Sequence, residues 1–456
     1  MEESSNLKYI VFFVVLIIGT PSAYFAALRY PIVEKLSFFL MIFFTARMVD
    51  INFVSRETFR LTSKGFEVGL VDVATLVILL LVLKRKKKHP LQTPPGTIPY
   101  FIYFALSALS IVNSSVILFS LFELWKMLRM YTFFWVIYNY FTDFDKFEEL
   151  MWILALVTAY IFFEVMKQKY GMGKFQSWGP FPHQNSLVMY SIILGAIFLS
   201  YLLNRKGLDS TKISIWLLVF SMISISVIST LSRAGMVLYG ISTVIVLGLS
   251  MLSGIDTRKA MVGVLLILVS LAVLARAWNS ISERFRTAPD ESAMVRQSLA
   301  KAALKMVKDK PLGVGLNNFG IKINPPWQYS NHIEMHNPDD EDEKNGLVET
   351  IYLMIAAESG WHTLASYVFL LLYFYYLNLL NFFRYRFTRL NFLPVALIGG
   401  LIAIYIESSL EWVLKQTNNF YQLMLVFALI AVMQKLYYAQ NRKRALSAAK
   451  GPELAS

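Results

Sequence analysis

The feature that most constrains the fold of this 456-residue chain is a succession of long apolar stretches. A helix that crosses the hydrocarbon core of a bilayer needs about 20 consecutive, mostly apolar residues. Such stretches lie near 9–28, 32–48, 68–83, 98–117, 119–140, 147–165, 185–203, 213–230, 234–252, 260–277, 350–380, 393–412 and 419–438. They predict an all-α, polytopic membrane helix bundle of about 12–13 spans, because helices satisfy their own backbone hydrogen bonds in lipid.

The composition supports this fold class and excludes several others. Hydrophobic residues make up 56% of the chain and charged residues only 16%, whereas soluble domains contain about 25% charged residues. A water-soluble enzyme and a disordered protein are therefore excluded. The chain has no cysteine, which removes disulfides, thiolate metal sites and cysteine nucleophiles.

The basic residues predict the orientation of the bundle. Lysine and arginine gather in cytoplasmic loops, and the run from Lys84 to Lys88 is the strongest marker. Alternation from that loop places the other basic clusters on the same side: Arg205–Lys206, Arg258–Lys259, Arg384, Arg386 and Arg389, and Arg442–Lys443–Arg444. Much of the formal net charge of +13 therefore reflects topology, and we expect no nucleic-acid partner.

The same alternation divides the chain into segments. We expect N-terminal transmembrane helices over 1–180, central transmembrane helices over 181–277, an extracytoplasmic loop over 278–348, C-terminal transmembrane helices over 349–440 and a cytoplasmic tail over 441–456. The long outer loop is predicted to be partly helical. It should start with an amphipathic helix whose apolar face carries Met294, Leu299, Ala302, Ala303 and Met306. Pro311 and the glycines of PLGVG should end this helix and turn it back on the bundle.

Two arginines are candidate anion-binding residues. Arg233 follows Ser232 between two apolar spans at the predicted outer face. It is either an interfacial arginine whose guanidinium reaches water or part of a phosphate site, where a guanidinium fork and a helix start supply donors. Arg296 lies on the amphipathic outer helix. There it is either one residue of a solvated face or a second phosphate contact.

Acidic and histidine residues near the last outer segment suggest proton transfer more than metal binding. Glu349 lies at the mouth of a span and could act as a general base, whereas Glu358 lies deeper and could pair with a helix end or a cation. Glu123, Lys126 and Arg129 are spaced for ion pairing within one span. The acids at 339–343 beside His332 and His336 are typical of a solvated loop, so we predict no metal site and no cofactor.

In order along the chain, these pieces resemble the O-antigen ligase and O-antigen polymerase superfamily of bacterial envelope glycan transferases. The resemblance covers roughly residues 180 to 412. It rests on the pair Ser232–Arg233 at the outer end of a span, Arg296 followed by the PLGVG turn at 311–315, and the sequence VETIYLMIAAESG at 348–360.

The resemblance implies an enzyme of the bacterial inner membrane whose active site faces the periplasm. Such enzymes transfer a glycan from undecaprenyl-pyrophosphate to an acceptor hydroxyl on a glycan or lipid core, with export or chain-length-control proteins as further partners. It implies that Arg233 and Arg296 bind the pyrophosphate, with Ser232, Glu358 and Arg129 in supporting positions.

One departure from the family pattern concerns the acid/base residue. Many members carry a His-Asn pair directly before the last outer span, where this chain has Glu349-Thr350; its own His-Asn pair is His336-Asn337. Glu349, fixed at a helix end, is preferred as the general base, and His336 is the alternative. Two other functions remain open: a transporter or flippase of a lipid-linked glycan, and a scaffold subunit of an export machine.

Overall fold

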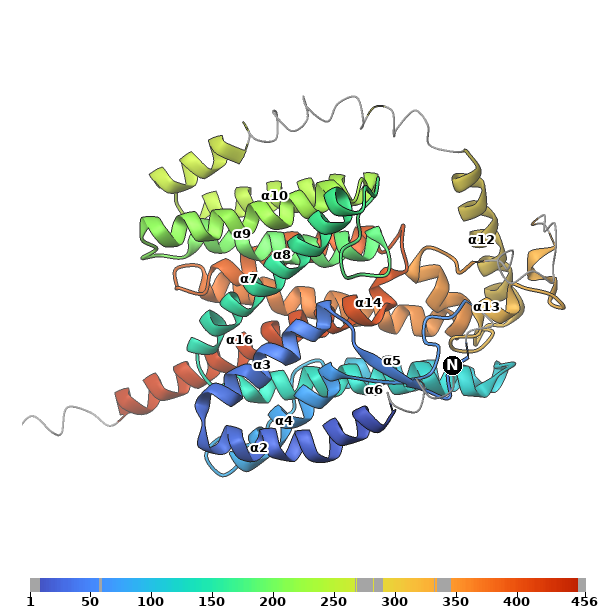
Figure 1. Cartoon of the computed structure of the whole chain (residues 1–456), viewed down its shortest axis with the longest axis horizontal. Coiled ribbons are helices and arrows are strands. Elements are labelled where there is room, and N and C mark those ends of the chain that lie inside the picture. The colour runs from blue at the N-terminus through green and yellow to red at the C-terminus, as the bar shows by residue number, and fades with distance from the viewer. Residues whose placement is uncertain are drawn as a thin grey trace, which may run out of the picture.

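The structure is a computed structural model that describes residues 9–56, 60–266, 290–331 and 346–449, together with 268, 282 and 333. It is mostly helical (Figure 1). Within these ranges, seven helices are long and apolar enough to cross a membrane: Tyr9–Arg29, Asp145–Gly171, Gln184–Asn204, Ser210–Ser229, Arg233–Leu252, Ile351–Tyr385 and Thr417–Arg442. Thr97–Asn113 and Phe392–Glu407 are shorter apolar helices. The predicted fold class, a polytopic membrane helix bundle, is confirmed.

The first half of the chain forms helices joined by short connections and one hairpin. In order these are η1 (Val15–Gly19), α2 (Thr20–Arg29), α3 (Pro31–Ala46), β1 (Asp50–Phe53), β2 (Phe66–Gly69), α4 (Leu70–Lys84), α5 (Thr97–Leu109), η2 (Ser110–Asn113), α6 (Ile117–Tyr140), α7 (Asp145–Met166) and η3 (Lys167–Gly171). Helix starts often follow the sequence: prolines occupy the first turns of α2 and α3, where the missing N–H costs no hydrogen bond.

The second half adds the remaining helices and the outer loop. These are α8 (Gln184–Asn204), α9 (Ser210–Ser229), α10 (Arg233–Leu252), α12 (Asp290–Asp309), α13 (Phe319–Lys322), η4 (Gln328–Ser330), α14 (Ile351–Tyr385), α15 (Phe392–Glu407), η5 (Val413–Lys415) and α16 (Thr417–Ala449). The predicted span at 260–277 is described only as far as 266, apart from 268, and is helical over that part.

Helix α8 is the centre of the bundle. The 18-residue window that marks it as a span is entirely buried, and α9, α10 and α15 pack around it. A helix that is apolar on all faces is buried either in lipid or among other helices, and for α8 the neighbouring helices take the place of lipid. Burial of α8 is complete from Ser186 onward, whereas Gln184 and Asn185 in its first turn are only half-buried.

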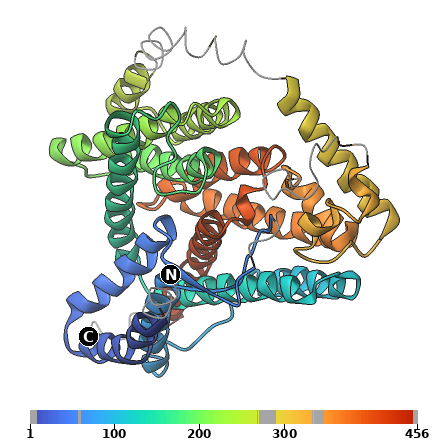
Figure 2. The same ribbon diagram turned by 45° about the vertical axis from the view of Figure 1, so that its right-hand side comes forward.

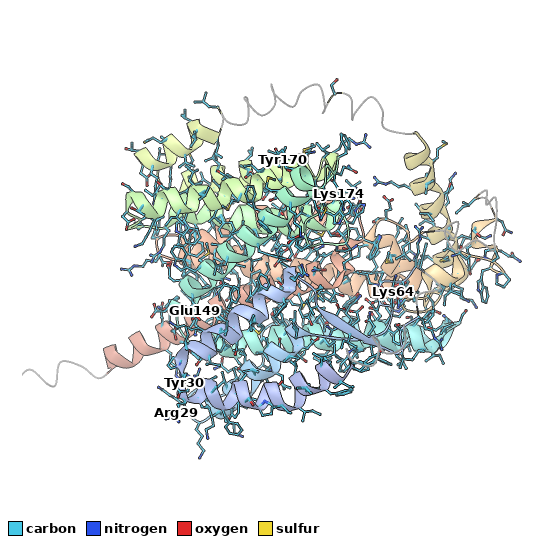
Figure 3. The ribbon with its side chains drawn as sticks, in the orientation of Figure 1. Arg29, Tyr30, Lys64, Glu149, Tyr170 and Lys174 are labelled. Carbon is cyan, nitrogen blue, oxygen red and sulfur yellow. The ribbon has the colours of Figure 1, made fainter. Side chains whose placement is uncertain are left out.

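The basic clusters share one end of the molecule. Arg258 Nη1 donates to the Arg205 carbonyl oxygen over 2.9 Å, and Arg205 Nη2 lies 2.7 Å from Glu148 Oε1. Arg386 Nη2 donates to the carbonyl oxygen of Leu252, over 2.9 Å. We call this the basic end, and the opposite side, with the hairpin and α12, the α12 end (Figures 1 and 2). In Figure 3, Arg29 and Glu149 lie toward the basic end, and Lys64 and Lys174 lie toward the α12 end.

A short β-hairpin at the α12 end was not expected from the sequence. Strands β1 and β2 are antiparallel, with Asp50 opposite Gly69 and Phe53 opposite Phe66. Each strand has four residues, which is too short to produce a recognisable alternation of polar and apolar residues. The hairpin projects polar side chains over the end of the bundle.

The predicted amphipathic helix of the outer loop is present as α12. Leu299, Ala302, Ala303 and Met306 are buried in one cluster with residues of α14, so this part of the predicted apolar face is confirmed. Met294 is 56% exposed, so its assignment to the buried face is wrong. The contact with α14 is made by the later turns of α12, and Met294 precedes them.

Glycines lock the outer loop against α14. Gly360 interrupts α14 with φ 84° and ψ 166°, which frees two carbonyls of the preceding turn. The Val314 N–H donates to the Ala357 carbonyl oxygen over 2.9 Å, and the Gly315 N–H donates to that of Glu358 over 3.0 Å. We call Gly360 and residues 311–315 the glycine latch. It confirms the prediction that the PLGVG turn folds the helix back on the bundle.

Candidate functional site

One arginine and two carboxylates meet at the α12 end. Arg296 on α12 contacts Glu349, which lies just before α14, through its Nε. Its Nη2 lies 3.3 Å from Oε1 of Glu411, in the connection between α15 and α16. Asn185, in the first turn of α8, donates through Nδ2 to the same Glu411 oxygen. We call these four residues the Arg296 cluster; sequence reasoning identified Arg296 and Glu349 but missed Glu411 and Asn185.

Burial shifts the protonation of both carboxyl groups. It raises the pKa of Glu411 to about 7; the nearby Glu349 carboxylate raises this pKa as well, whereas Arg296 and the Asn185 hydrogen bond lower it. The pKa of Glu349 is also raised by burial, against the opposing effect of Arg296. Two carboxyl groups around one guanidinium form a coupled pair, which can hold a single proton near neutral pH.

Arg296 keeps donors for a ligand despite these contacts. A guanidinium has five N–H donors, and the two carboxylate contacts engage one on Nε and one on Nη2. Within the described part of the chain, the other three donors have no hydrogen-bond partner. The side chain is 45% exposed. A planar fork with spare donors suits two oxygens of a phosphate group.

Arg233 begins α10 at the same level as Asn185. Helices α8 and α10 run in parallel, because Gly235 packs against Val188 at one end and Asn204 donates to Ser250 over 2.7 Å at the other. Arg233 is two residues before Gly235, and Asn185 is three residues before Val188, which at 1.5 Å per residue puts both about one turn or less from that contact. Ser232 is the N-cap residue of α10.

The remaining predicted acid/base residue lies outside the described residues. This holds for His336 and also for His332 and the acids at 339–343. In the ranges that are described, no group of three or more metal-binding side chains could hold a metal ion.

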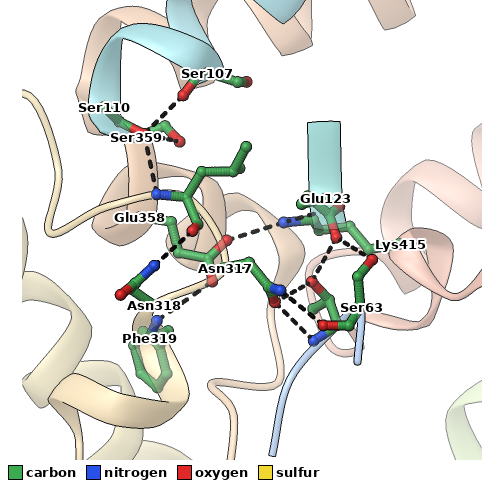
Figure 4. Close-up of polar contacts among 12 residues, drawn as sticks. Ser63, Ser107, Ser110, Glu123, Asn317, Asn318, Phe319, Glu358, Ser359 and Lys415 are labelled. Carbon is green, nitrogen blue, oxygen red and sulfur yellow. Dashed lines mark hydrogen bonds and ion pairs between the residues drawn. The ribbon is translucent and has the colours of Figure 1, made fainter. Parts of the chain in front are cut away.

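Glu358 belongs to a second charged cluster, which is fully buried (Figure 4). Lys415 Nζ lies 3.0 Å from Glu358 Oε2 and 3.7 Å from Glu123 Oε1. Lys126 Nζ lies 2.8 Å from Glu123 Oε2. Two lysines and two glutamates thus neutralise one another, as buried charges require. We call Glu123, Lys126, Glu358 and Lys415 the ion-pair brace.

The brace connects segments that are far apart in the sequence. Thr62 and Ser63, just before β2, donate to Glu123 Oε2 over 2.9 and 2.7 Å. Asn317 in the outer loop accepts from the Thr62 N–H over 3.0 Å and donates to the Ser63 carbonyl oxygen over 2.8 Å. The hairpin, α6, α14, the outer loop and residues 411–418 are therefore fixed relative to each other. Lys415 belongs to the segment that starts with Glu411, so the brace supports the Arg296 cluster.

Arg129 does not join the brace, although it shares α6 with Glu123 and Lys126. Its Nη2 lies 2.7 Å from Asp72 Oδ2 on α4, and its Nη1 lies 3.4 Å from Glu67 on β2. The side chain is 4% exposed. Arg129 thus connects α6 to α4 and to the hairpin.

The fold defines a multi-pass membrane protein with a polar site at one end of the bundle. Residues 217–368 match the sequence model of the O-antigen ligase family. That range contains Arg233, Arg296, Glu349 and Glu358, so the chain carries an O-antigen ligase domain and the resemblance noted from the sequence is confirmed. No curated protein matches the chain. Glu411, Asn185 and the hairpin lie outside the matched range.

Proposed function

We propose that the protein transfers a glycan from undecaprenyl-pyrophosphate to an acceptor hydroxyl during the assembly of a bacterial surface polysaccharide. The reaction takes place at the α12 end, on the periplasmic side of the inner membrane. The observation that carries the proposal is the Arg296 cluster: an arginine of the O-antigen ligase domain, with spare N–H donors, beside a coupled pair of carboxyl groups.

Arg233 and Arg296 bind the pyrophosphate of the donor. In the transfer, the acceptor oxygen forms a bond to the anomeric carbon, and the bond from that carbon to the pyrophosphate oxygen breaks. The leaving pyrophosphate gains negative charge as this bond breaks. Guanidinium donors aimed at that charge stabilise the transition state more than the ground state.

The proton of the acceptor hydroxyl passes to the coupled carboxyl pair. Glu349, the base expected from the sequence, is fixed against Arg296 Nε, and Glu411 is the member with a pKa of about 7. A general base is most effective when its pKa is near the working pH, so Glu411 takes the proton and Glu349 holds Arg296 in place. His336 is the alternative base. Ser232, Glu358 and Arg129 support the site by positioning α10 and the α12 end.

The acceptor decides whether the protein is a polymerase or a ligase. A polymerase adds repeats to a growing glycan, whereas a ligase attaches a finished chain to a lipid core or another acceptor. In either role, export or chain-length-control proteins are further partners. Charged residues within membrane-spanning helices are a common feature of transporters. Those of α6 lie in the brace and in the Arg129 contacts, and this static role gives no support to transport.

The test is transfer by the purified protein in liposomes that contain undecaprenyl-pyrophosphate oligosaccharide. Products are separated on gels and identified by mass spectrometry. We expect a covalent glycan product from the wild type, and a loss of at least about 100-fold for Arg233→Ala and Arg296→Ala, since each removes charge-assisted bonds to the leaving group. Arg389→Ala, an exposed arginine of the basic end, is the matched control and should keep full activity.

Two results would contradict the proposal. One is wild-type transfer by both arginine variants. The other is movement of the lipid-linked glycan across the bilayer with no change of its covalent partner, which would identify a transporter instead.

A further inference from the structure

A cavity of about 450 Å³ lies at the α12 end, beside the Arg296 cluster. Its size is within the range of about 300–1,000 Å³ that is usual for small-molecule sites. It is lined by the hairpin and its connection (Asp50, Lys64 and Glu67), by residues 180–182, by Trp412 and by residues 416–418. Three segments of the chain, distant in sequence, therefore build one polar concavity with aromatic side chains in its wall.

The polar groups of this cavity include both donors and acceptors. Lys64 Nζ and Gln416 Nε2 can donate, whereas the Asp50 carboxylate and Asn418 Oδ1 can accept. Within the described part of the chain, none of these four groups bonds to another residue. Gln416 and Asn418 are nevertheless held in place, because Ser186 donates to Gln416 Oε1 and Asn418 Nδ2 donates to the Thr45 carbonyl oxygen over 2.9 Å.

This combination fits a sugar better than a phosphate. A sugar hydroxyl both donates and accepts, so it matches alternating donors and acceptors. The apolar C–H face of a pyranose packs on aromatic rings, and the half-buried Trp412 supplies one. A phosphate is not favoured, since the cavity has two carboxylates, Asp50 and Glu67, beside the cation Lys64. Arg129, behind the wall, is already paired with Glu67 over 3.4 Å.

Two segments run directly from the Arg296 cluster into the cavity. Glu411 belongs to the cluster, and the next residue, Trp412, lines the cavity. Asn185 bonds to Glu411, whereas Pro180, Phe181 and Pro182 on the same segment line the cavity. A ligand unit in the cavity would thus lie against the two segments that also carry Glu411 and Asn185.

We propose that this cavity binds one sugar unit of a glycan substrate and so orients that glycan toward the Arg296 cluster. The inference rests on the proposed glycan transfer. The sugar belongs either to the acceptor or to the glycan of the donor, and kinetics distinguish these two sources.

The first experiment measures KM and kcat for donor and acceptor in proteoliposomes. The variants are Asp50→Asn and Lys64→Met, which remove one polar contact each and keep most of the side-chain volume. We expect KM for one of the two glycans to rise at least about tenfold, as for a lost hydrogen bond to a charged group, with kcat changed less than about twofold. A rise in the acceptor KM assigns the cavity to the acceptor, and a rise in the donor KM assigns it to the donor.

Lys308→Met is the matched control, because Lys308 is an exposed lysine of α12 that does not line the cavity. Its kinetic constants should equal those of the wild type. Unchanged KM values for both substrates in Asp50→Asn and in Lys64→Met would overturn the inference while leaving the proposed transfer intact.

A binding measurement tests the cavity without catalysis. The probe is the oligosaccharide released by mild acid from the host's own lipid-linked intermediate, observed by saturation-transfer NMR with the full-length protein in detergent. We expect saturation of its signals by the wild type and at least about a tenfold weaker effect with the double variant Asp50→Asn, Lys64→Met. No saturation by the wild type would overturn the inference, whether or not transfer is observed.

Discussion

At the scale of single residues, the main feature is that Arg296 is shared by two carboxyl groups. A guanidinium that only bound phosphate would need no such neighbours, and their negative charge would oppose anion binding. Burial resolves this conflict, because it raises the pKa of both Glu349 and Glu411. With one proton on the pair, the cluster is close to neutral and Arg296 can still donate to an anion.

The shared proton leads to a prediction for the pH dependence of transfer. Only the ionised carboxylate can accept a proton, so kcat/KM should rise about tenfold per pH unit below the pKa of Glu411, about 7, and level off above it. Glu349→Gln removes a negative charge that raises this pKa, so the rise should move to lower pH. Glu411→Gln should abolish the rise of kcat/KM with pH and most of the activity.

The measurement is the pH–rate profile of the wild type and the two variants in proteoliposomes. If Glu411→Gln kept the wild-type profile and Glu349→Gln were inactive, Glu349 would be the base and the assignment to Glu411 would be wrong.

The brace gives a second prediction, on stability. Lys415→Met removes a cation that neutralises the buried carboxylates of Glu358 and Glu123. This should lower the free energy of unfolding by about 3–5 kcal/mol. The double variant Lys415→Met, Glu358→Gln removes the charge that was left unpaired, so it should be more stable than Lys415→Met alone. Thermal unfolding in detergent measures both. Lys212→Met is the control, because its pair with Asp209 is 3.4 Å long and its side chain is 50% exposed; such an exposed pair contributes little to stability. Equal midpoints for Lys415→Met and Lys212→Met would show that the brace does not hold the α12 end together.

At the scale of elements, hydropathy was sufficient for the helices because each must be apolar over most of its length to lie in lipid. The predicted spans at 185–203 and 234–252 correspond closely to α8 and α10. The hairpin could not be predicted, since four-residue strands outside the bilayer carry no such constraint. The place of Glu411 in the site could not be predicted from the sequence for a related reason. The apolar run at 393–412 was interpreted as one span, whereas α15 ends at Glu407 and the next residues turn toward α12.

The glycine latch gives a prediction at this scale. Gly360 has φ 84° and ψ 166°, a conformation that is essentially restricted to glycine, and an added Cβ would lie 2.3 Å from the Pro311 carbonyl oxygen. Gly360→Ala should therefore destabilise the protein by more than the roughly 1–3 kcal/mol of backbone strain alone. Gly240→Ala in α10 is the matched control. Its Cβ would meet nothing within 4 Å, and alanine is the better helix former by about 1 kcal/mol. Thermal unfolding should show a lower midpoint for Gly360→Ala and an equal or higher one for Gly240→Ala; the reverse order would contradict the role of the latch.

At the scale of the whole molecule, the site is assembled from segments that only the fold brings together. The Asn185–Glu411 hydrogen bond joins residues 226 positions apart, and Arg296 and Glu411 are 115 apart. Sequence motifs identified the arginines because each stands in a local pattern. They could not pair Glu411 with Arg296, nor reveal the cavity, because those contacts depend on the return of α15 and α16 to the α12 end.

The distribution of basic residues predicts which end of the molecule faces the periplasm. The basic clusters of the short loops, represented by Arg205, Arg258 and Arg386, lie at the basic end. Lysine and arginine of short loops favour the cytoplasmic side, so the α12 end should face the periplasm. Because the chain has no cysteine, single cysteines report position without background. Met294→Cys is on α12 and Thr211→Cys is near the basic end, and both positions are exposed. A membrane-impermeant maleimide should label Met294→Cys in intact spheroplasts. It should label Thr211→Cys only after the spheroplast membrane has been permeabilised. A detergent-denatured sample controls for the reactivity of each thiol. The opposite pattern would put the Arg296 cluster in the cytoplasm, where a glycan exported on its lipid carrier could not reach it, and the proposed transfer would have to be abandoned.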